Sequence, residues 1–519
     1  MEYINTFLNL SIFTEAKPNL PKPSLSLIEN TNQVYYIKKP LIKVTLNVPS
    51  KFNNKELPLG GFEYNEASST TKQHVFPKEL CEDVIIDGVS VGPINTYTFT
   101  AGKHIVEYAM KDETKVVDTQ FFGFRFLGIE NVEIPDSVTS IGSGSFSGCI
   151  GLTTIMIPDS VTSIENYTFN NCTGLTTIMI PDSVTSIGSE TFKNCTGLTS
   201  ITIPDSVTSI GKDVFSGCKG LMTFKLPNNI TSIVPGAFRG CTGLKTVDLT
   251  SYSNLGTIEK GAFDGCSGLT SITIPDSVTS IGSFTFTDCT GFTSITIPNS
   301  VTSIENDTFR GCTGLTAFKL PIDITSIGSS AFYGCSGLKT VDLTSYSKLT
   351  SIGYMAFYNC TGLTTVKLPN KLTSIENSTF YNCTGLTSIT IPDSVTSIGF
   401  EAFEGCTGLK TVDLTSYSKL ETIGTYAFYN CTGLTTVKLP NKLTSIEYCA
   451  FLDCSSLTSI TIPDSVTSID DKAFYDCSIL REVTYKGKIY TSKQELLNDL
   501  EINNVTIGKQ IFDNTGLGA

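Results

Sequence analysis

Residues 195–217 read CTGLTSITIPDSVTSIGKDVFSG, and close copies of this 23-residue unit recur about fifteen times between residues 129 and 485. Phe215 and Cys218 mark two positions that recur from copy to copy, with Cys three residues after Phe. Three steps between copies are 25 residues long instead of 23. A unit this short cannot bury a core by itself, so it must stack on its own copies. The repeat therefore predicts an elongated solenoid, and such a fold offers a long surface suited to binding.

The first half of the unit carries the pattern of a strand. Residues 198–203 follow the spacing L-x-x-I-x-I, and its I-x-I part alternates as a strand does when one face is buried. Pro204 and Asp205 are expected to end this strand in a turn. Further inward side chains come from the return path, at Val207, Ile210 and Phe215. Strands of successive copies should pair in parallel, which predicts a mainly β solenoid with a parallel sheet of about 16 strands.

These blocks resemble the BspA-type leucine-rich repeat. The phrase IPDSVTSIG begins at Ile134, Ile180, Ile203, Ile274 and Ile391, and the phrase AFYNCTGL begins at Ala356 and Ala427. The resemblance covers about two thirds of the chain. It implies a curved solenoid with a parallel sheet on one side, and roles in surface adhesion and in binding host or matrix proteins.

The repeat occupies only part of the chain. Residues 1–30 are expected to be a loosely ordered leader. Residues 31–118 are expected to be a small β-sandwich, with the immunoglobulin type as the candidate architecture, because short alternating runs are separated by turn residues such as Asp87-Gly88. The solenoid is assigned to residues 119–485 and a C-terminal cap and tail to residues 486–519. In that cap, Lys486-Gly487 predicts a hairpin bend, and Ser492 with Glu495 predicts the start of a helix.

Composition excludes several classes of function. The formal net charge of −13 argues against nucleic acid and anionic membrane surfaces, because neutralising phosphates requires clustered Lys and Arg. No run of eighteen apolar residues occurs, so no membrane insertion is expected. The first sixteen residues lack the basic start of a signal peptide, which favours the cytoplasm, whereas the family resemblance favours the cell surface. The compartment stays open at this point.

Seventeen cysteines could suggest a disulfide framework, but fifteen of them occupy one position of the repeat. Such a column predicts a ladder of buried thiols. Disulfides between neighbouring copies and metal binding are the alternatives, although paired C-x-x-C motifs are lacking, and no cofactor is expected. Gly197 and Gly217 are expected to allow tight corners on either side of this column.

Specificity should lie at the outward position of the strand, which Thr202 occupies in the quoted copy. Opposite charges follow one another there, either neutralising each other across the ladder or forming polar contact spots on a Thr-rich binding face. The residues are Lys225, Asp248, Lys319, Asp342, Lys367, Asp413 and Lys438. Three tyrosines in the longer copies either contact a partner or pack over the core edge: Tyr252, Tyr346 and Tyr417.

The sequence contains few residues or motifs that would indicate an enzyme. Only two histidines occur, His74 and His104, and both precede the repeats. Common hydrolase, phosphate-loop and metalloprotease motifs do not occur. The sequence thus predicts a monomeric, non-enzymatic solenoid that binds extracellular, matrix or host proteins through many weak contacts. An intracellular protein-interaction scaffold is the alternative, and an enzyme that uses the N-terminal region is a remote third.

Overall fold

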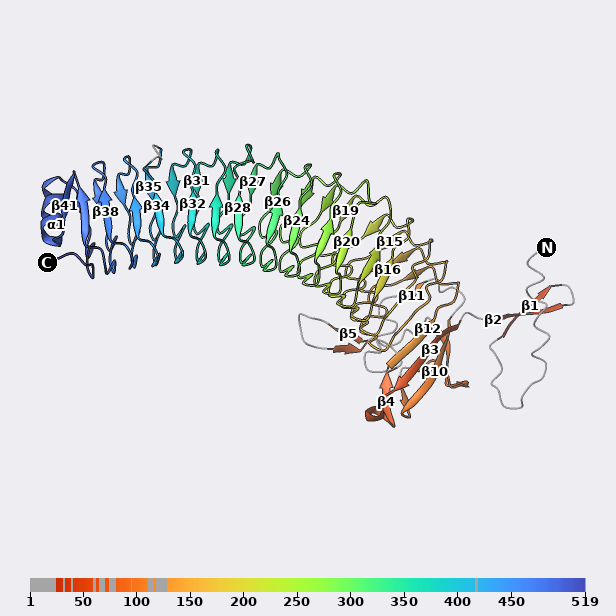
Figure 1. The fold of residues 1–519 in the computed structure, drawn as a ribbon. Coiled ribbons are helices and arrows are strands. Elements are labelled where there is room, and N and C mark those ends of the chain that lie inside the picture. Colours follow the sequence, from red (N-terminus) through yellow and green to blue (C-terminus); the bar gives the residue numbers. More distant parts are fainter. Residues whose placement is uncertain are drawn as a thin grey trace. The chain divides into compact units, whose positions relative to one another are not determined.

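The computed structural model describes residues 25–30, 33–38, 41–58, 62–64, 71–73, 81–94, 96–110, 116–117, 128–415 and 419–518 (Figure 1). The chain divides into two compact units. Unit 1 comprises Met1–Val214 and Cys218–Pro227, and unit 2 comprises Phe215–Gly217 and Asn228–Ala519. Residues 1–24, His74 and Tyr417 lie outside the described residues.

Unit 1 begins with antiparallel strands. Its largest antiparallel sheet has the order β12-β3-β10-β7-β8, formed by Gly128–Glu133, Leu41–Val48, Gly102–Met110, Cys81–Ile86 and Val89–Ser90. Two-stranded pairs join β1 (Leu25–Asn30) to β2 (Gln33–Lys38), β4 (Lys55–Pro58) to β9 (Thr96–Phe99), and β5 (Phe62–Tyr64) to β6 (Thr71–Gln73), with a short 3-10 turn, η2 (Ser50–Phe52). Residues 25–30, assigned to a leader from the sequence, therefore form a strand, while the immunoglobulin-like sandwich stays a prediction.

The repeats form the predicted parallel ladder, to which most copies contribute one strand, whereas the copies with Met156 and Met179 contribute single backbone bridges. In unit 1, β16 (Ser200–Thr202) pairs in register with β18 (Thr223–Lys225). In unit 2 the corresponding strands are β20 (Thr246–Asp248), β22 (Ser271–Thr273), β24 (Ser294–Thr296), β26 (Ala317–Lys319), β28 (Thr340–Asp342), β30 (Thr365–Lys367), β32 (Ser388–Thr390), β34 (Thr411–Asp413), β36 (Thr436–Lys438), β38 (Ser459–Ile462) and β40 (Glu482–Tyr485). The mainly β solenoid is confirmed, and its successive strands lie side by side in Figure 1.

A second ladder runs along the return path, which the sequence pattern did not identify as a strand. In unit 1 it consists of β11 (Val116–Val117), β13 (Ser140–Ile141), β14 (Ser163–Ile164), β15 (Ser186–Ile187) and β17 (Ser209–Ile210). In unit 2 it consists of β19 (Ser232–Ile233), β21 (Thr257–Ile258), β23 (Ser280–Ile281), β25 (Ser303–Ile304), β27 (Ser326–Ile327), β29 (Ser351–Ile352), β31 (Ser374–Ile375), β33 (Ser397–Ile398), β35 (Thr422–Ile423), β37 (Ser445–Ile446), β39 (Ser468–Ile469) and β42 (Thr506–Ile507). Two residues are too few for a periodic signal, which explains the omission.

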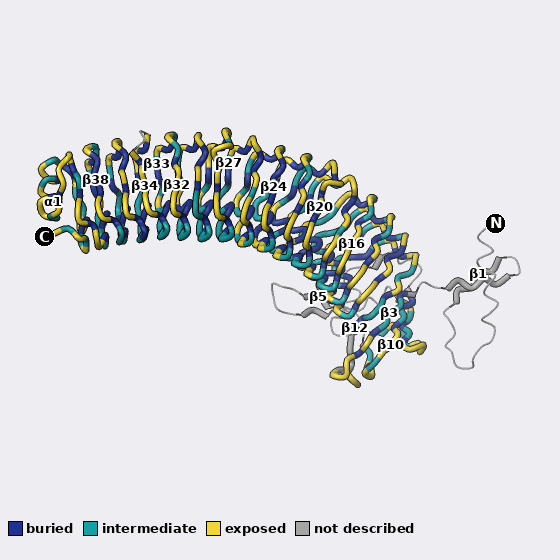
Figure 2. The backbone as a smooth tube through the Cα atoms, viewed as in Figure 1, coloured by how far each residue is buried: buried dark blue, intermediate teal, exposed yellow. Residues whose placement is uncertain are grey.

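Two columns of identical side chains fill the core between the ladders, where Figure 2 shows buried segments in every turn of the solenoid. The ring centroids of Phe309 and Phe332 lie 5.3 Å apart with the rings nearly parallel, and both side chains are fully buried. Each thiol donates to a Phe carbonyl one copy earlier, as the Cys312 Sγ does to the Phe286 oxygen at 3.1 Å. The cysteines described are free and buried, as predicted.

Glycine serves two purposes at the turns that flank the cysteine column. Gly217 has a φ of 76°, the left-handed conformation that favours glycine, in agreement with the expected tight corner. Gly197 is needed for a different reason, because a Cβ atom there would lie 2.7 Å from the Thr173 carbonyl oxygen of the preceding copy. A side chain at this position would push two turns of the solenoid apart.

The C-terminal cap has the elements that the sequence predicts. A hairpin joins β40 to β41 (Lys488–Tyr490), with Lys486 and Gly487 at φ of 48° and 75°. Helix α1 (Lys493–Ile502) begins at Ser492, whose side chain accepts a hydrogen bond from the Glu495 amide. Beyond it, β42 pairs with β39 and the Phe512 ring stacks on Phe474 at 5.3 Å, so the tail adds one more turn to the solenoid.

Removing one ring from the Phe column should be costly. We expect Phe309→Ala to lower the free energy of unfolding by about 3–5 kcal/mol, because it leaves a cavity between two stacked rings. Urea unfolding followed by circular dichroism measures this. Tyr354→Ala is the matched control, since this side chain is 46% exposed and its loss should change stability by no more than about 0.5 kcal/mol. If both changes lower the free energy of unfolding equally, the Phe column does not contribute more to stability than an exposed side chain does.

The thiol column should make stability sensitive to alkali. Burial raises the pKa of the Cys312 thiol to about 12, whereas a thiol in the unfolded chain titrates near about 8.5. Above that pH the unfolded state loses protons that the folded state keeps, so the free energy of unfolding should fall as the pH rises toward about 12, by up to about 1.4 kcal/mol per pH unit for each such thiol.

Urea unfolding between pH 8 and pH 10 checks this pH dependence. Cys312→Ser keeps a hydrogen-bond donor but removes the titrating group. In this variant the free energy of unfolding should therefore fall less steeply with pH, by the amount that the titration of one thiol contributes. An unchanged slope would show that Cys312 does not contribute.

Candidate functional site

The sheet strands expose alternate side chains, and these side chains form what we call the sheet face. In β16, Ser200 and Thr202 are exposed while Ile201 between them is buried. The same exposed–buried–exposed order recurs in β22, β24, β28 and β36. Because the core uses only the inward residues, the outward ones are free to vary between copies. The sheet face is therefore where a partner could be recognised without cost to the fold.

Two methionines occupy the outward position of consecutive copies in unit 1. Backbone bridges join Glu133 to Met156 and Met156 to Met179, so the three residues lie in register on neighbouring turns of the solenoid. The Met156 and Met179 side chains are 79% and 80% exposed. Exposing an apolar side chain this fully has no benefit for folding, which makes the pair a candidate contact point.

The methionine pair lies in a hollow of about 1200 Å³ that extends over five successive copies in unit 1. Strand residues of the sheet face and the Pro-Asp turns that follow them line the hollow, which we call the methionine hollow. Its charged lining residues are four carboxylates and one ammonium group: Glu133, Asp136, Asp182, Asp205 and Lys225. The hollow thus combines an apolar centre with an excess of negative charge.

Charges on the sheet face of unit 2 are arranged differently, because two carboxylates there have a lysine partner on the next strand. Lys367 Nζ lies 3.0 Å from Asp342 Oδ2, and Lys438 Nζ lies 2.7 Å from Asp413 Oδ2. All four side chains are about half exposed. Ion pairs this exposed contribute little to stability, at most about 1 kcal/mol.

Local hydrogen bonds hold these aspartates in place. The Thr344 hydroxyl and amide both donate to Asp342 Oδ1, at 2.6 and 3.1 Å. The Thr344 hydroxyl and the Lys367 ammonium lower the pKa of Asp342 to about 2. At Asp413, the corresponding bonds from Lys438 and Thr415 have the same effect and lower its pKa to about 2. Both carboxylates therefore stay charged over the physiological pH range.

The remaining charged residues of the predicted site are Lys225, Asp248 and Lys319. Asp248 accepts hydrogen bonds from the Thr250 hydroxyl and amide, which lower its pKa. Lys319 makes no ion pair within the described residues. Lys225 lines the methionine hollow in unit 1, whereas Asp248 belongs to unit 2, so their predicted pairing stays a prediction.

Two tyrosines of the longer copies, Tyr252 and Tyr346, pack against the solenoid. Tyr252 is only 4% exposed, and the Tyr346 hydroxyl accepts a hydrogen bond from the Leu320 amide at 3.3 Å. Of the two alternatives for this group, burial favours core-edge packing for Tyr252. Tyr417 lies outside the described residues, so its role stays a prediction.

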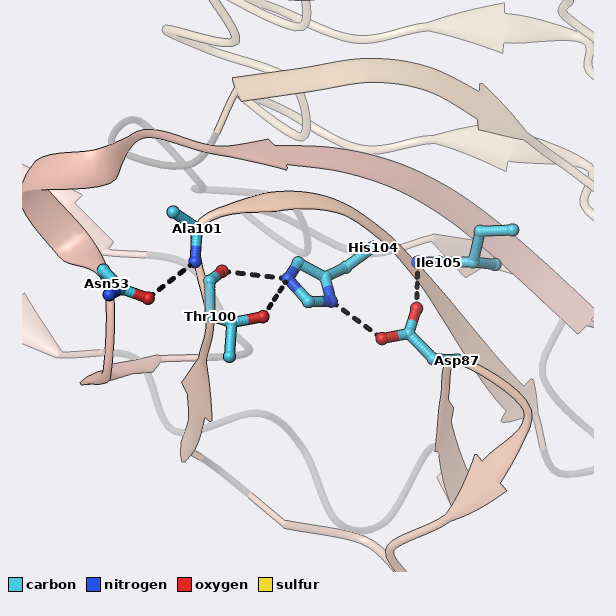
Figure 3. Close-up of polar contacts among 6 residues, drawn as sticks. All are labelled: Asn53, Asp87, Thr100, Ala101, His104 and Ile105. Atoms are coloured by element: carbon cyan, nitrogen blue, oxygen red, sulfur yellow. Dashed lines mark hydrogen bonds and ion pairs between the residues drawn. The ribbon is translucent and has the colours of Figure 1, made fainter.

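His104 is the histidine within the described part, and its ring links two turns of the N-terminal sheet (Figure 3). The ring Nε2 lies 2.9 Å from the Thr100 carbonyl oxygen, and Nδ1 lies 2.7 Å from Asp87 Oδ2. Asp87 in turn accepts a hydrogen bond from the Ile105 amide at 2.8 Å. Both ring nitrogens thus have a polar partner within the N-terminal sheet. This arrangement supports a structural clamp.

Within the described ranges, no three His, Cys, Asp or Glu side chains come together as a metal site. The described part of the chain contains no helix with the length and apolar character needed to cross a membrane.

Comparison with known proteins agrees with the repeat geometry. The model of the BspA type leucine rich repeat region matches residues 52–150, 119–245, 243–348, 337–419 and 412–515. The chain belongs to the BspA-type leucine-rich repeat family. Families of this kind are generally non-enzymatic.

Solved structures include related bacterial leucine-rich repeat proteins. A protein from Bacteroides ovatus is 30% identical, with a TM-score of 0.56, over 83% of this chain and 98% of its own. A leucine rich cell surface protein from Faecalibacterium prausnitzii is 27% identical, with a TM-score of 0.35, over 72% of this chain and 86% of its own. A comparison with curated protein sequences finds no match.

Sequence reasoning placed the site at charged residues and did not single out the methionines. The signal was present, since Met156 and Met179 are the two apolar members of an outward column that otherwise holds Thr, Lys, Asp and Glu. What the sequence could not show is that Pro-Asp turns and strand residues from five copies enclose a common hollow around them.

The clamp at His104 can be tested through stability. We expect His104→Ala to lower the free energy of unfolding by about 1–3 kcal/mol, because it leaves the polar groups of Asp87 and Thr100 without their ring partner. Thermal unfolding followed by circular dichroism measures this. Thr98→Ala, at an exposed position of the adjoining strand, is the control and should change little. If His104→Ala unfolds with the same free energy as the natural chain, the ring does not stabilise the N-terminal sheet.

Proposed function

We propose that this chain is a non-enzymatic protein-binding solenoid that contacts its partners through the sheet face. The observation that carries the proposal is the exposed Met156–Met179 pair inside a hollow of about 1200 Å³. Large exposed apolar side chains within a polar rim are typical of interaction sites. The charged residues of the unit 2 sheet face would supply additional contacts, and many weak contacts along one array add up to useful affinity.

The partners we propose are extracellular, matrix or host proteins, as family membership suggests, and the protein would act as a monomer. An intracellular scaffold of the same fold is the alternative. Treating intact cells with an external protease distinguishes the two, because only a surface protein is cleaved. Buried thiols suit either compartment, since burial protects them from oxidation.

A charge exchange tests the contribution of the unit 2 sheet face. Asp342→Lys combined with Lys367→Asp keeps the ion pair but reverses the charge at each position. We expect unchanged thermal stability and at least about threefold weaker retention of the proteins or cells that the natural chain binds, because each array contact is individually weak. Retention on beads carrying the full chain is the measurement.

The control is Tyr354→Lys, which introduces a charge on an exposed side chain that belongs to neither ladder. Its retention of partners should equal that of the natural chain. If the charge exchange and this control behave alike, the unit 2 sheet face makes no contribution. If, in addition, changes within the methionine hollow leave retention unchanged, then binding through the sheet face is wrong.

A further inference from the structure

The methionine hollow differs from the rest of the sheet face in its chemistry. At the corresponding outward position, unit 2 carries Thr273, Thr296 and Lys319 and other polar residues, whereas consecutive copies in unit 1 carry Met156 and Met179. Methionine is flexible and polarisable, and it adapts to apolar and aromatic side chains of different shapes. The pair therefore provides an adaptable apolar seat in a polar, Thr-rich surface.

Among the described residues, three carboxylates around this seat lack the lysine partners that the paired aspartates of unit 2 have. Asp342 and Asp413 each have a lysine within 3.0 Å. Within the described part of the chain, by contrast, Glu133, Asp136 and Asp182 have no ion-pair partner. Lys225 is the one basic residue in the lining. The hollow therefore favours a ligand with positive charge on either side of an apolar group.

The dimensions of the hollow suit a short extended chain. Five copies with strands about 4.8 Å apart extend over about 19 Å, and an extended peptide covers that distance with about six residues. The two methionines lie on adjacent turns, so a single large side chain can contact both. Basic residues two positions before and after that side chain would reach the flanking carboxylates.

We propose that the methionine hollow binds an extended segment of a protein partner in which one large apolar side chain lies between basic residues. This inference rests on the proposed protein-binding function and names the chemistry of its ligand at one part of the sheet face. The apolar side chain occupies the seat made by Met156 and Met179. The basic side chains face Glu133, Asp136 and Asp182.

The chain has no tryptophan, which permits a direct test with the full-length protein. The probe is a capped peptide, Arg-Ala-Trp-Ala-Arg-Ala, whose indole is the one source of tryptophan fluorescence in the mixture. We expect saturable binding with a blue-shifted emission and an affinity that falls as salt is added. The matched peptide Glu-Ala-Trp-Ala-Glu-Ala should bind at least about tenfold more weakly, because its charges face carboxylates.

Two variants of the protein assign the contacts. Met156→Thr with Met179→Thr places in the hollow the residue that Thr202 supplies at the equivalent position, so the fold should be kept, and it should weaken probe binding at least about tenfold. Asp136→Asn with Asp182→Asn should weaken binding and flatten its salt dependence. Thr296→Ala, on the sheet face of unit 2, is the control and should change nothing.

The proposal is overturned if the acidic peptide binds as tightly as the basic one. Unchanged binding to the double methionine variant, or no saturable binding up to about 1 mM peptide, would overturn it equally. Failure here is distinguishable from failure of the proposed function. If the basic probe does not bind but the unit 2 charge exchange still reduces partner retention, the solenoid binds proteins and only the ligand chemistry assigned to the hollow is wrong.

Discussion

Backbone hydrogen bonds between the corresponding turns of consecutive copies hold every repeat in one register, and the packing of the core follows from that register. The Phe309 amide donates to the Ala331 carbonyl at 2.8 Å, and the same bond recurs through both units. Since every such bond requires the same register, a shift by one residue would misplace both the Phe and the Cys columns. Each Phe ring therefore packs on the Phe ring of the neighbouring copy. The same register lets the thiols of the column donate to a Phe carbonyl one copy earlier.

The longer copies show how strictly this register is kept. Cys360 donates to the Phe332 carbonyl across 28 residues, whereas Cys312 reaches Phe286 across 26, with almost the same distance in both cases. The two added residues lie between the two ladders, and in the first long copy Tyr252 folds inward over the core. An insertion is thus accommodated in the connecting segment and leaves the stacked columns unchanged.

Because the core uses only inward residues, the outward residues can serve recognition. In unit 2 the acidic residues Asp342 and Asp413 each form an ion pair with a neighbouring lysine, so the negative and positive charges of each pair offset each other. In unit 1, Glu133, Asp136 and Asp182 line the hollow around the exposed methionine pair and form no ion pair within the described residues. The same scaffold therefore presents two surfaces of different chemistry, and the proposed function draws on both.

Sequence patterns alone predicted the solenoid, the strand of the repeat, the buried cysteine ladder and the C-terminal hairpin and helix. Each of these features follows from a local sequence pattern. For the solenoid, the pattern recurs in so many copies that its period cannot arise by chance. Three features were decided only by the tertiary structure. The second ladder is two residues per copy, and it exists because stacking brings Ser209–Ile210 beside its equivalent. The last turn around Phe512 comes from a tail whose single partial copy carries little signal. The methionine hollow requires five copies to be placed side by side, and a linear pattern cannot show which side chains then share one concave space.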